Sequence, residues 1–329
     1  MTWTSRLRHL VSRTRRQLLG IPQPPATPQA RAQAVPVPKE LIDRLDRIEQ
    51  ALARIQTLAE KSYARERRIE PGVEAVLRKL YLDPAALPFP QQLTAHRFRL
   101  FSQNQEDGMT LDLLRRVDAR NHRFVELGSG LSGGNSAVLA AELGWSGLMV
   151  DGSATHIAQV QRRFPGVTAA STWITAEGVN DLISQHGFGG DLGLLSIDLD
   201  GNDYWVWNAI TVCDPDVVVV EYNSMFGPDR AVTIPYDPAF SRGQHRFIYY
   251  GTSLAALASL ARKKGYRLVA VEPTGVNAYF LRNGCGPDVP ECSPRQAFRL
   301  LEKYDVLIQQ KGVDIYEYVT SANLPLVEV

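Results

Sequence analysis

The sequence predicts a doubly wound α/β sheet, and three features of its longer, C-terminal part indicate that fold. Short apolar runs alternate with amphipathic stretches between residues 124 and 281. Two of these runs, 194–197 and 217–220, are almost wholly apolar, as expected of strands buried on both faces of a parallel sheet. The first run, 124–127, leads directly into a glycine-rich turn. Strands that alternate with helices in this way typify a sheet covered by helices on both faces.

The predicted elements follow one another along the chain. Expected strands lie at 124–127, 148–150, 170–174, 194–197, 217–220, 267–271 and 278–281. Expected helices lie at 135–143, 155–163, 179–186 and 254–264, with a further helix at Tyr204. Ligands of such sheets bind at the carboxyl ends of the strands, so functional side chains are expected there.

The charge of the chain is divided unevenly along its length. Residues 1–39 contain seven Lys and Arg residues and no acidic residue. Removing those seven from the 36 basic residues leaves 29 against 35 acidic ones, so residues 40–329 carry a net charge of −6. A body that follows nucleic-acid phosphates needs a basic face, so the composition argues against nucleic-acid binding.

The N-terminal residues predict three segments ahead of the sheet. Residues 1–20 form a basic arm whose apolar side chains share one helical face over 2–19, which favours either an anionic membrane surface or a protein partner. Residues 21–38 contain six prolines and predict an extended linker. Residues 39–90 are expected to be helical, and 91–329 to form the main domain.

The helical segment carries a coiled-coil pattern. Its seam residues are spaced alternately by four and three: Leu41, Leu45, Ile48, Leu52 and Ile55. The spacing predicts a homo-oligomer that assembles through 41–58, and the alternative is a helix folded onto its own domain.

The cellular location is expected to be cytoplasmic. No apolar run approaches the roughly 20 residues of a membrane-spanning helix. The three cysteines form no CxxC motif, which favours reduced thiols. The arginine pair at Arg15 and Arg16 is followed by prolines instead of an apolar stretch, so export is not predicted. A peripheral membrane location is expected if the basic arm binds lipid.

The glycine-rich turn predicts a cofactor that contains adenosine. Gly128, Gly130 and Gly133 match the GxGxxG pattern, whose glycines allow a tight turn and close approach of a ligand. Asp151 closes the next predicted strand, 23 residues beyond Gly128, where a carboxylate can accept hydrogen bonds from ribose hydroxyls. These features fit either NAD or S-adenosylmethionine.

Two observations favour S-adenosylmethionine. Glu126 precedes the glycines, where a carboxylate would repel a pyrophosphate but could pair with the cationic amino-acid tail of S-adenosylmethionine, directly or through water. The tyrosines include no Tyr-x-x-x-Lys pair, which one large class of Rossmann reductases uses for proton transfer. NAD remains the alternative cofactor.

These residues resemble a known family. Glu126-Leu127-Gly128-Ser129-Gly130 resembles the first motif of class I S-adenosylmethionine-dependent methyltransferases, and Asp151 matches their second-strand acid. The wider set is similar to the FkbM-like branch, through residues 102–108, 135–136, 144–147 and 196–201. In the last segment Ser196 and Asp200 replace the Lys and Glu of that branch.

The resemblance spans 98–284 and implies a seven-stranded, mostly parallel, Rossmann-like methyltransferase sheet. It also implies that the protein transfers methyl groups to hydroxyls, often of sugars. The expected cofactor-binding residues are Gln103, Glu106, Glu126, Gly128, Ser129, Gly130, Asp151, Gly152, Ser153, Glu177 and Asp198.

Polar residues follow the two most apolar strands and predict a second functional feature. Asp198, Asp200, Asn202 and Asp203 follow one strand, and Glu221 and Asn223 follow the next. Parallel strand ends meet at one rim, so Asp198, Glu221 and Asn223 are expected ligands for Mg²⁺, which prefers oxygen donors. Alternatively, Asp198 and Asp200 contact the cation of the cofactor and cap the following helix.

Methyl transfer to oxygen also requires a group that accepts the proton. His245 is the expected base because an unperturbed histidine titrates near neutrality, and Asp200 and Glu221 are the competing candidates. The 28-residue stretch 222–249 is long for a connection, which predicts a lid or a binding loop. Tyr236, Tyr249 and Tyr250, in or next to this stretch, are expected either to form a floor for a sugar ring or to pack ordinarily.

The sequence therefore predicts an S-adenosylmethionine-dependent O-methyltransferase that acts on a hydroxyl of a glycan or a similar polar metabolite. An NAD-dependent oxidoreductase is the first alternative, because it would use the same glycine turn. A non-catalytic scaffold, docked to a partner through its N-terminal segment, is the second.

Overall fold

The structure is a computed structural model that describes Lys39, Val76 and residues 84–119, 121–245, 248–301, 304 and 324–329. The chain divides into two units, Met1–Arg67 and Arg68–Val329. The predicted basic arm, the proline-rich linker and the coiled-coil seam at 41–58 lie outside the described residues. Among the residues that are described, no helix has the length and apolar character needed to cross a membrane.

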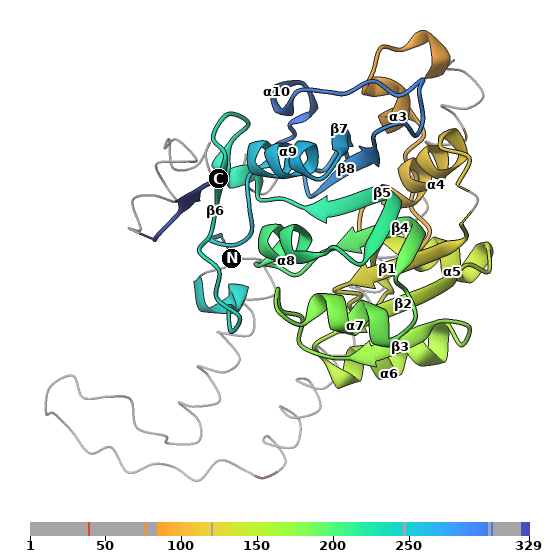
Figure 1. Ribbon diagram of the computed structural model, residues 1–329, viewed down its shortest axis with the longest axis vertical. Helices are drawn as coiled ribbons and strands as arrows, with labels where there is room; N and C mark the ends of the chain where they lie inside the picture. Colours follow the sequence, from red (N-terminus) through yellow and green to blue (C-terminus); the bar gives the residue numbers. More distant parts are fainter. Residues whose placement is uncertain are drawn as a thin grey trace, which may run out of the picture. The chain divides into compact units, whose positions relative to one another are not determined.

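A seven-stranded sheet forms the centre of the second unit (Figure 1), in the order β3-β2-β1-β4-β5-β8-β7. The strands are β1 (Arg123–Leu127), β2 (Ser146–Asp151), β3 (Thr168–Ser171), β4 (Gly190–Ile197), β5 (Cys213–Glu221), β7 (Tyr266–Val271) and β8 (Asn277–Arg282). The pairs from β3 to β5 are parallel, whereas β8 runs antiparallel to both β5 and β7. The predicted doubly wound, mostly parallel sheet is confirmed.

Helices cover both faces of the sheet because alternate strand residues point to opposite sides. Leu127 packs on one side in a cluster with Val179, Val206 and Leu257, which come from α7 (Val179–Gln185), α8 (Asp203–Ala209) and α9 (Leu254–Lys263). Phe124 packs on the other side with residues of α4 (Glu106–Arg116), α5 (Ala137–Glu142) and α6 (Ala154–Arg163). The short helices α3 (Gln91–Ala95) and α10 (Pro294–Ala297) complete the unit.

Local sequence explains where the principal helices begin. The Ser153 hydroxyl accepts a hydrogen bond from the His156 amide and caps α6, and Ser253 does the same for α9 with the Ala256 amide. Both helices carry basic residues in their last turn, which complements the helix dipole. Cys213, Cys285 and Cys292 are free thiols, as the sequence predicts.

Helix α4 and strand β3 differ from the sequence expectations. Helix α4 was not predicted, because its first turn contains Glu106, Asp107 and Gly108, which do not read as an amphipathic start. The structure fixes this turn through Asp107, whose Oδ2 accepts the amides of Leu100, Phe101 and Ser102 at 2.6, 2.8 and 3.1 Å. Strand β3 ends at Ser171, so Trp173 and Ile174 of the expected strand lie beyond it.

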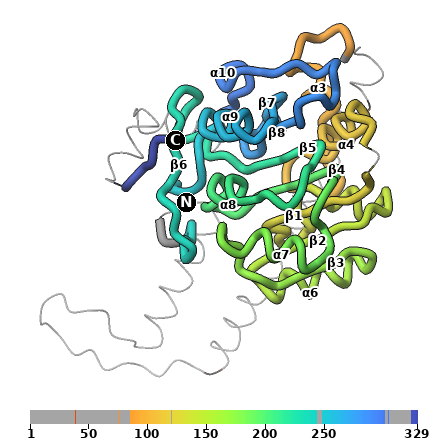
Figure 2. Tube along the Cα trace, viewed as in Figure 1, coloured from red at the N-terminus to blue at the C-terminus, as the bar shows by residue number. Residues whose placement is uncertain are grey.

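The long connection between β5 and α9 has a small core of its own. We call its described residues, within 222–253, the strap; Figure 2 traces its path in the same view as Figure 1. The strap contains β6 (Val232–Thr233), which pairs with β9 (Val327–Glu328). Its core residues are Met225, Phe226, Val232, Ile234, Phe240, Tyr249 and Tyr250, with Tyr304 from outside the strap. This core gives the strap a defined path over the carboxyl ends of the strands.

Candidate active site

A cavity of about 990 Å³ lies at the carboxyl ends of β1, β2 and β4. The strand order reverses between β1 and β4, and this is where doubly wound sheets bind their ligands. The predicted site residues that line the cavity are Gln103, Gly128, Ser129, Gly130, Asp151, Gly152, Ser153, Asp198 and Asp200. Its volume is at the upper end of the range for small-molecule sites, which is room for a cofactor together with a second molecule.

The glycine turn folds tightly against the neighbouring strands. Gly128 has a φ of +93°, and a Cβ at this position would overlap the carbonyl oxygen of Asp198. Gly130 also has a positive φ, and its amide donates to Oδ2 of Asp151 at 2.9 Å. The turn is therefore held by backbone contacts to the ends of both β2 and β4, and only glycine fits at Gly128 without strain.

Asp151 is oriented by three donors at the edge of the cavity. Besides the Gly130 amide, its Oδ1 lies 2.7 Å from the Ser153 amide and 3.0 Å from Nδ1 of His156. The carboxylate links the glycine turn to the start of α6 and still lines the cavity. That is the position that the sequence predicts for a ribose-binding acid.

Glu126 occupies a different place from the one expected. Its side chain is fully buried, and it accepts hydrogen bonds from the amides of Asn135 and Ser136, at 3.2 and 2.9 Å, and from the Ser196 hydroxyl at 2.9 Å. Burial raises the pKa of Glu126 to about 7, although these hydrogen bonds oppose the shift. Glu126 does not line the cavity; it holds the turn before α5 and the Ser196 hydroxyl, whereas pairing with a cofactor cation, directly or through water, was predicted.

Glu106 also lies outside the cavity lining and is linked to it through Asn277. It is fully buried, and its Oε1 accepts the Nδ2 amide of Asn277 at 2.9 Å. Asn277 lines the cavity, and its Oδ1 has no hydrogen-bond partner among the described residues. Sequence reasoning missed Asn277 because its strand, β8, is antiparallel, which brings the start of the strand to the rim where the parallel strands end.

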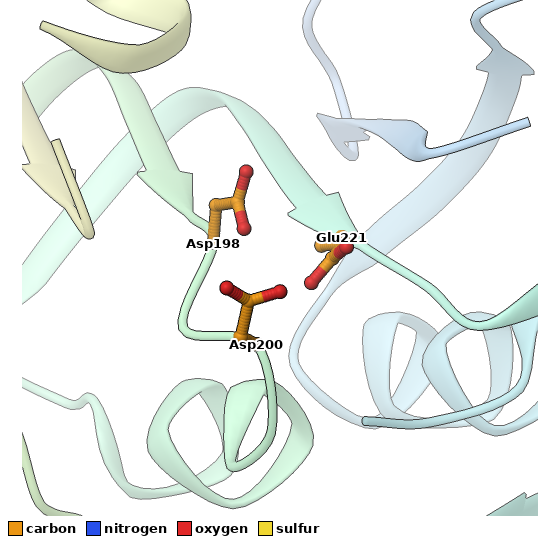
Figure 3. Close-up of side chains that lie close together, drawn as sticks. All are labelled: Asp198, Asp200 and Glu221. Atoms are coloured by element: carbon orange, nitrogen blue, oxygen red, sulfur yellow. The ribbon is translucent and has the colours of Figure 1, made fainter. Parts of the chain in front are cut away.

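Three carboxylates gather beside the cavity, and we call Asp198, Asp200 and Glu221 the acidic group (Figure 3). Their oxygens lie within 4.8 Å of one another. Burial, followed by repulsion from Asp200 and Asp203, raises the pKa of Asp198 well above its usual range. Burial and the charge of Asp198 do the same to the pKa of Glu221. Oε2 of Glu221 has no hydrogen-bond partner among the described residues.

A cation from the strap enters this acidic group. Nη1 of Arg242 forms an ion pair with Asp200 and lies 3.5 Å from Oε1 of Glu221. The guanidinium carbon lies 3.5 Å from the centroid of the Tyr250 ring, and the side chain is only 15% exposed. The sequence predicts a role for His245 in this segment but not for Arg242, because charge pairing across the fold leaves no signal in local spacing.

The remaining predicted residues do not meet at the acidic group. Asn223 is fully buried, its Nδ2 donates to the carbonyls of Ile248 and Tyr250, and its Oδ1 accepts the Met225 amide at 3.0 Å. It therefore braces the strap instead of serving as the metal ligand that was predicted. The side chain of His245 lies outside the described part of the structure.

Glu177 is exposed and lies away from the cavity lining. Its Oε2 accepts the hydroxyl of Tyr236 at 2.5 Å, and this hydrogen bond lowers the pKa of Glu177. The contact attaches the strap to the turn before α7, so Glu177 does not occupy the predicted cofactor-binding position. Of the three tyrosines expected near a sugar, Tyr249 and Tyr250 are buried in the core of the strap.

The strap is attached to the cavity wall at two further points. Nε1 of Trp173 donates to the Pro238 carbonyl at 2.6 Å, and Nδ2 of Asn202 donates to the Asp237 carbonyl at 2.8 Å. The Trp173 ring lies over Gly152, where a Cβ would come within 2.8 Å of the ring. Trp173, Asn202 and Arg242 all line the cavity, so the strap borders it.

The acidic group, as it stands, does not fit a divalent metal. Carboxylate oxygens are suitable ligands for Mg²⁺. However, two of the three carboxylates already contact Arg242, and the third predicted ligand, Asn223, is committed to the strap. A metal ion bound here would face the guanidinium at close range.

A scan against protein-family models finds no match for the sequence, and a search of curated proteins finds no relative. Among solved structures, the O-methyltransferase from Bacillus cereus in complex with SAH is 14% identical, with 64% of this chain and 96% of that chain covered at a TM-score of 0.37. A TehB-like SAM-dependent methyltransferase from Corynebacterium glutamicum is 15% identical and covers 52% and 86% at a TM-score of 0.28. The methyltransferase domain of bacterial CtHen1-C is 14% identical and covers 54% and 97% at 0.35. Similarities at these identities and TM-scores carry no argument about the function.

Proposed function

We propose that the protein is an S-adenosylmethionine-dependent O-methyltransferase whose acceptor is a hydroxyl of a glycan or a similar polar metabolite. One observation carries the proposal: a glycine turn, fixed to Asp151 and Asp198, borders a large cavity at the reversal point of the sheet. The resemblance of residues 126–130 and 151 to class I methyltransferase motifs supports the same cofactor, and the FkbM-like resemblance supports the hydroxyl acceptor.

The residues around the cavity fit this cofactor. The Ser129 hydroxyl, Oδ1 of Asn202 and Oδ1 of Asn277 are buried and lack hydrogen-bond partners among the described residues, and all three residues line the cavity. Such groups are usually satisfied, so each is available to a polar ligand. Asp198 places a carboxyl group beside the glycine turn, which suits a cationic ligand better than the pyrophosphate of NAD.

The strand order also separates this proposal from the NAD alternative. Dinucleotide-binding sheets typically run 3-2-1-4-5-6 and are mostly parallel. Here the antiparallel strand β8 is inserted between β5 and β7. The edge of the sheet beyond β5 therefore presents Asn277, at the start of β8, to the cavity.

The bound cofactor supplies an electrophilic methyl carbon on a sulfonium. The residues of this chain hold the acceptor and receive its proton: as the acceptor oxygen bonds to the methyl carbon, the carbon–sulfur bond breaks and the hydroxyl proton must leave. Asp200 is the carboxylate of the competing pair that lines the cavity, and we assign it as the proton acceptor. Asn202 and Asn277 offer amide oxygens to the other hydroxyls of a polar acceptor.

Ligand-induced stabilisation tests the proposal. Purified full-length protein is melted with S-adenosylhomocysteine, with NAD⁺ and with neither. We expect only S-adenosylhomocysteine to raise the melting temperature. Asp151→Asn should weaken its binding roughly tenfold, as expected when charge-assisted hydrogen bonds are lost. Asp181→Asn, on the exposed face of α7, is the matched control. Stabilisation by NAD⁺ alone would favour the oxidoreductase, and stabilisation by neither would favour the scaffold.

The acceptor is then sought by transfer of a labelled methyl group from S-adenosylmethionine to sugars, nucleotide sugars and oligosaccharides. Label that is recovered as a base-stable ether on a sugar would support the acceptor class. Label that is recovered only on nitrogen, sulfur or carboxylate acceptors would contradict it.

We also propose that the protein assembles as a homo-oligomer through 41–58 and contacts anionic membranes through 2–19. The sequence patterns in these segments support both ideas. Deletion of residues 1–60 should reduce the mass found by light scattering and abolish binding to vesicles that contain phosphatidylserine. An unchanged mass or unchanged vesicle binding would overturn the corresponding idea.

A further inference from the structure

We infer that the guanidinium of Arg242 is the resident cation of the acidic group and takes the place that a divalent metal would fill. The predicted magnesium site is thus replaced by a charge that the chain itself supplies. The consequence for catalysis, that transfer proceeds without a metal, rests on the proposed function; the occupancy of the site by Arg242 does not.

The position of Arg242 is the first observation. Its Nη1 contacts carboxylates that follow two different strands: Asp200 after β4 and Glu221 at the end of β5. The third member, Asp198, lies with them inside a 4.8 Å group. A single nitrogen atom that contacts two members of this group occupies the region where a bound metal ion would have to sit.

The side chain is also held from its other face. The Tyr250 ring lies 3.5 Å from the guanidinium carbon, and Tyr250 is itself only 2% exposed. A cation over an aromatic ring is favourable, and more so when water is excluded. The backbone just before Arg242 is attached to the cavity wall by the Pro238 and Asp237 carbonyls. The guanidinium that contacts the acidic group is therefore held in place by the Tyr250 ring and by the attached strap.

The balance of charge explains why the group requires a cation. Three carboxylates lie close together, and Glu221 is only 6% exposed while Asp200 is 57% exposed. A cation among them lowers the mutual repulsion of those that are ionised. The Arg242 guanidinium, which contacts two of the three, supplies that positive charge.

A divalent ion and Arg242 would compete for the same oxygens. Both carry positive charge, and at contact distance their repulsion in a buried site is large. Binding of the metal would require the guanidinium to leave Asp200, Glu221 and the Tyr250 ring together. Removal of the guanidinium should convert the acidic group into a metal site, since the three carboxylates would then lack a cation.

Direct measurement of Mn²⁺ binding tests the inference on the full-length protein. Mn²⁺ is titrated into wild type, Arg242→Met and Arg242→Lys, and bound ion is followed by electron paramagnetic resonance. Wild type and Arg242→Lys should show no saturable site. Arg242→Met should bind one equivalent about tenfold or more tightly than wild type, because affinity follows the uncompensated ligand charge. The double variant Arg242→Met with Glu221→Gln should lose the gained site.

Two results would overturn the inference. One is a stoichiometric Mn²⁺ site in wild type that disappears in Glu221→Gln. The other is an Arg242→Met protein that gains no site. Circular dichroism and S-adenosylhomocysteine binding establish that each variant is folded. Should Arg242→Met be unfolded, Arg242→Gln replaces it, and the wild-type titration decides on its own whether the group already holds a metal.

An activity measurement separates the inference from the proposed function. Wild-type protein dialysed against EDTA should transfer methyl groups at the same rate as protein that was not dialysed. If it still binds S-adenosylhomocysteine but requires added Mg²⁺ for turnover, the inference fails and the proposed function stands. If it binds no S-adenosylhomocysteine, the proposed function fails, while the Mn²⁺ titrations continue to report on Arg242.

Discussion

The two halves of the cavity rim are held by different kinds of hydrogen bond. In the half formed by β1 and β2, backbone amides of the glycine turn and of the α5 start bond to Asp151 and Glu126. In the half formed by β4, β5 and β8, side chains bond to one another across the fold, as between Asn277 and Glu106, 171 residues apart. The first half is thus sensitive to the shape of the backbone, and the second to the identity of distant charges and amides.

The largest expected effect tests the backbone-built half. Gly128→Ala places a methyl group against the Asp198 carbonyl oxygen at a φ of +93°. Overlap and left-handed strain should together lower the free energy of unfolding by roughly 3–5 kcal/mol. Urea denaturation measures the loss. Gly166→Ala, where a Cβ meets nothing within 4 Å, is the matched control and should change it by less than about 0.5 kcal/mol. Equal losses would contradict the comparison.

A pH titration of stability tests the role of Glu126 in the same half. Its pKa is about 7 in the folded protein against 4.5 for the free side chain. Between these values the folded state holds a proton that the unfolded state has lost, so the stabilisation by this proton is full below pH 4.5 and declines up to pH 7. The decline from this group should be about 3 kcal/mol. Glu126→Gln should remove it, and parallel curves for the two proteins would disprove the assignment.

Asn223→Ala tests the strap, which follows β5 in the second half. The substitution leaves the Ile248 and Tyr250 carbonyls without their donor and the Met225 amide without its acceptor. Buried groups left unpaired should lower the free energy of unfolding by about 2–3 kcal/mol. Asn208→Ala, on the exposed face of α8, should leave it within about 0.5 kcal/mol. A metal-ligand role for Asn223 predicts instead that stability depends on Mg²⁺.

The smallest effect concerns the contact that joins the halves. Trp173→Phe keeps an aromatic ring over Gly152 but removes the donor to the Pro238 carbonyl. Removal of this hydrogen bond should cost about 1 kcal/mol, the typical net contribution of one hydrogen bond. We expect it to show as faster dissociation of S-adenosylhomocysteine in stopped-flow measurements. An unchanged dissociation rate would mean that this contact does not hold the strap beside the cavity.

The same contrast explains what could be predicted from the sequence. The apolar runs predicted the positions of β1, β4 and β5 to within a few residues, because a strand buried on both faces is recognisable from its own apolar residues. Asp151 lies where the spacing from the glycines predicts, because one strand–helix–strand unit fixes both. These inferences needed only neighbours in the sequence.

Arg242 and Asn277 were beyond such reasoning. A short apolar run at 278–281 does not indicate the direction of its strand in the sheet. The antiparallel course of β8 and the position of Asn277 at the rim could therefore not be predicted. Arg242 reaches the acidic group only because the strap has its own core. The burial of Glu126 and Glu106 outside the cavity lining could not be predicted for a related reason: a motif gives the residue and not the direction of its side chain.

The attachment of the strap has a consequence for redesign of the protein. Within seven residues, 236–242, the strap contacts Glu177, which lies outside the cavity lining, and Trp173, Asn202 and Asp200, which line the cavity. A library of substitutions in the strap that aims to change the proposed acceptor would therefore also disturb the contacts of the strap with the cavity wall. Improved variants should be found sooner when new contacts are introduced from Asn277 and its neighbours on β8, which lie outside the strap.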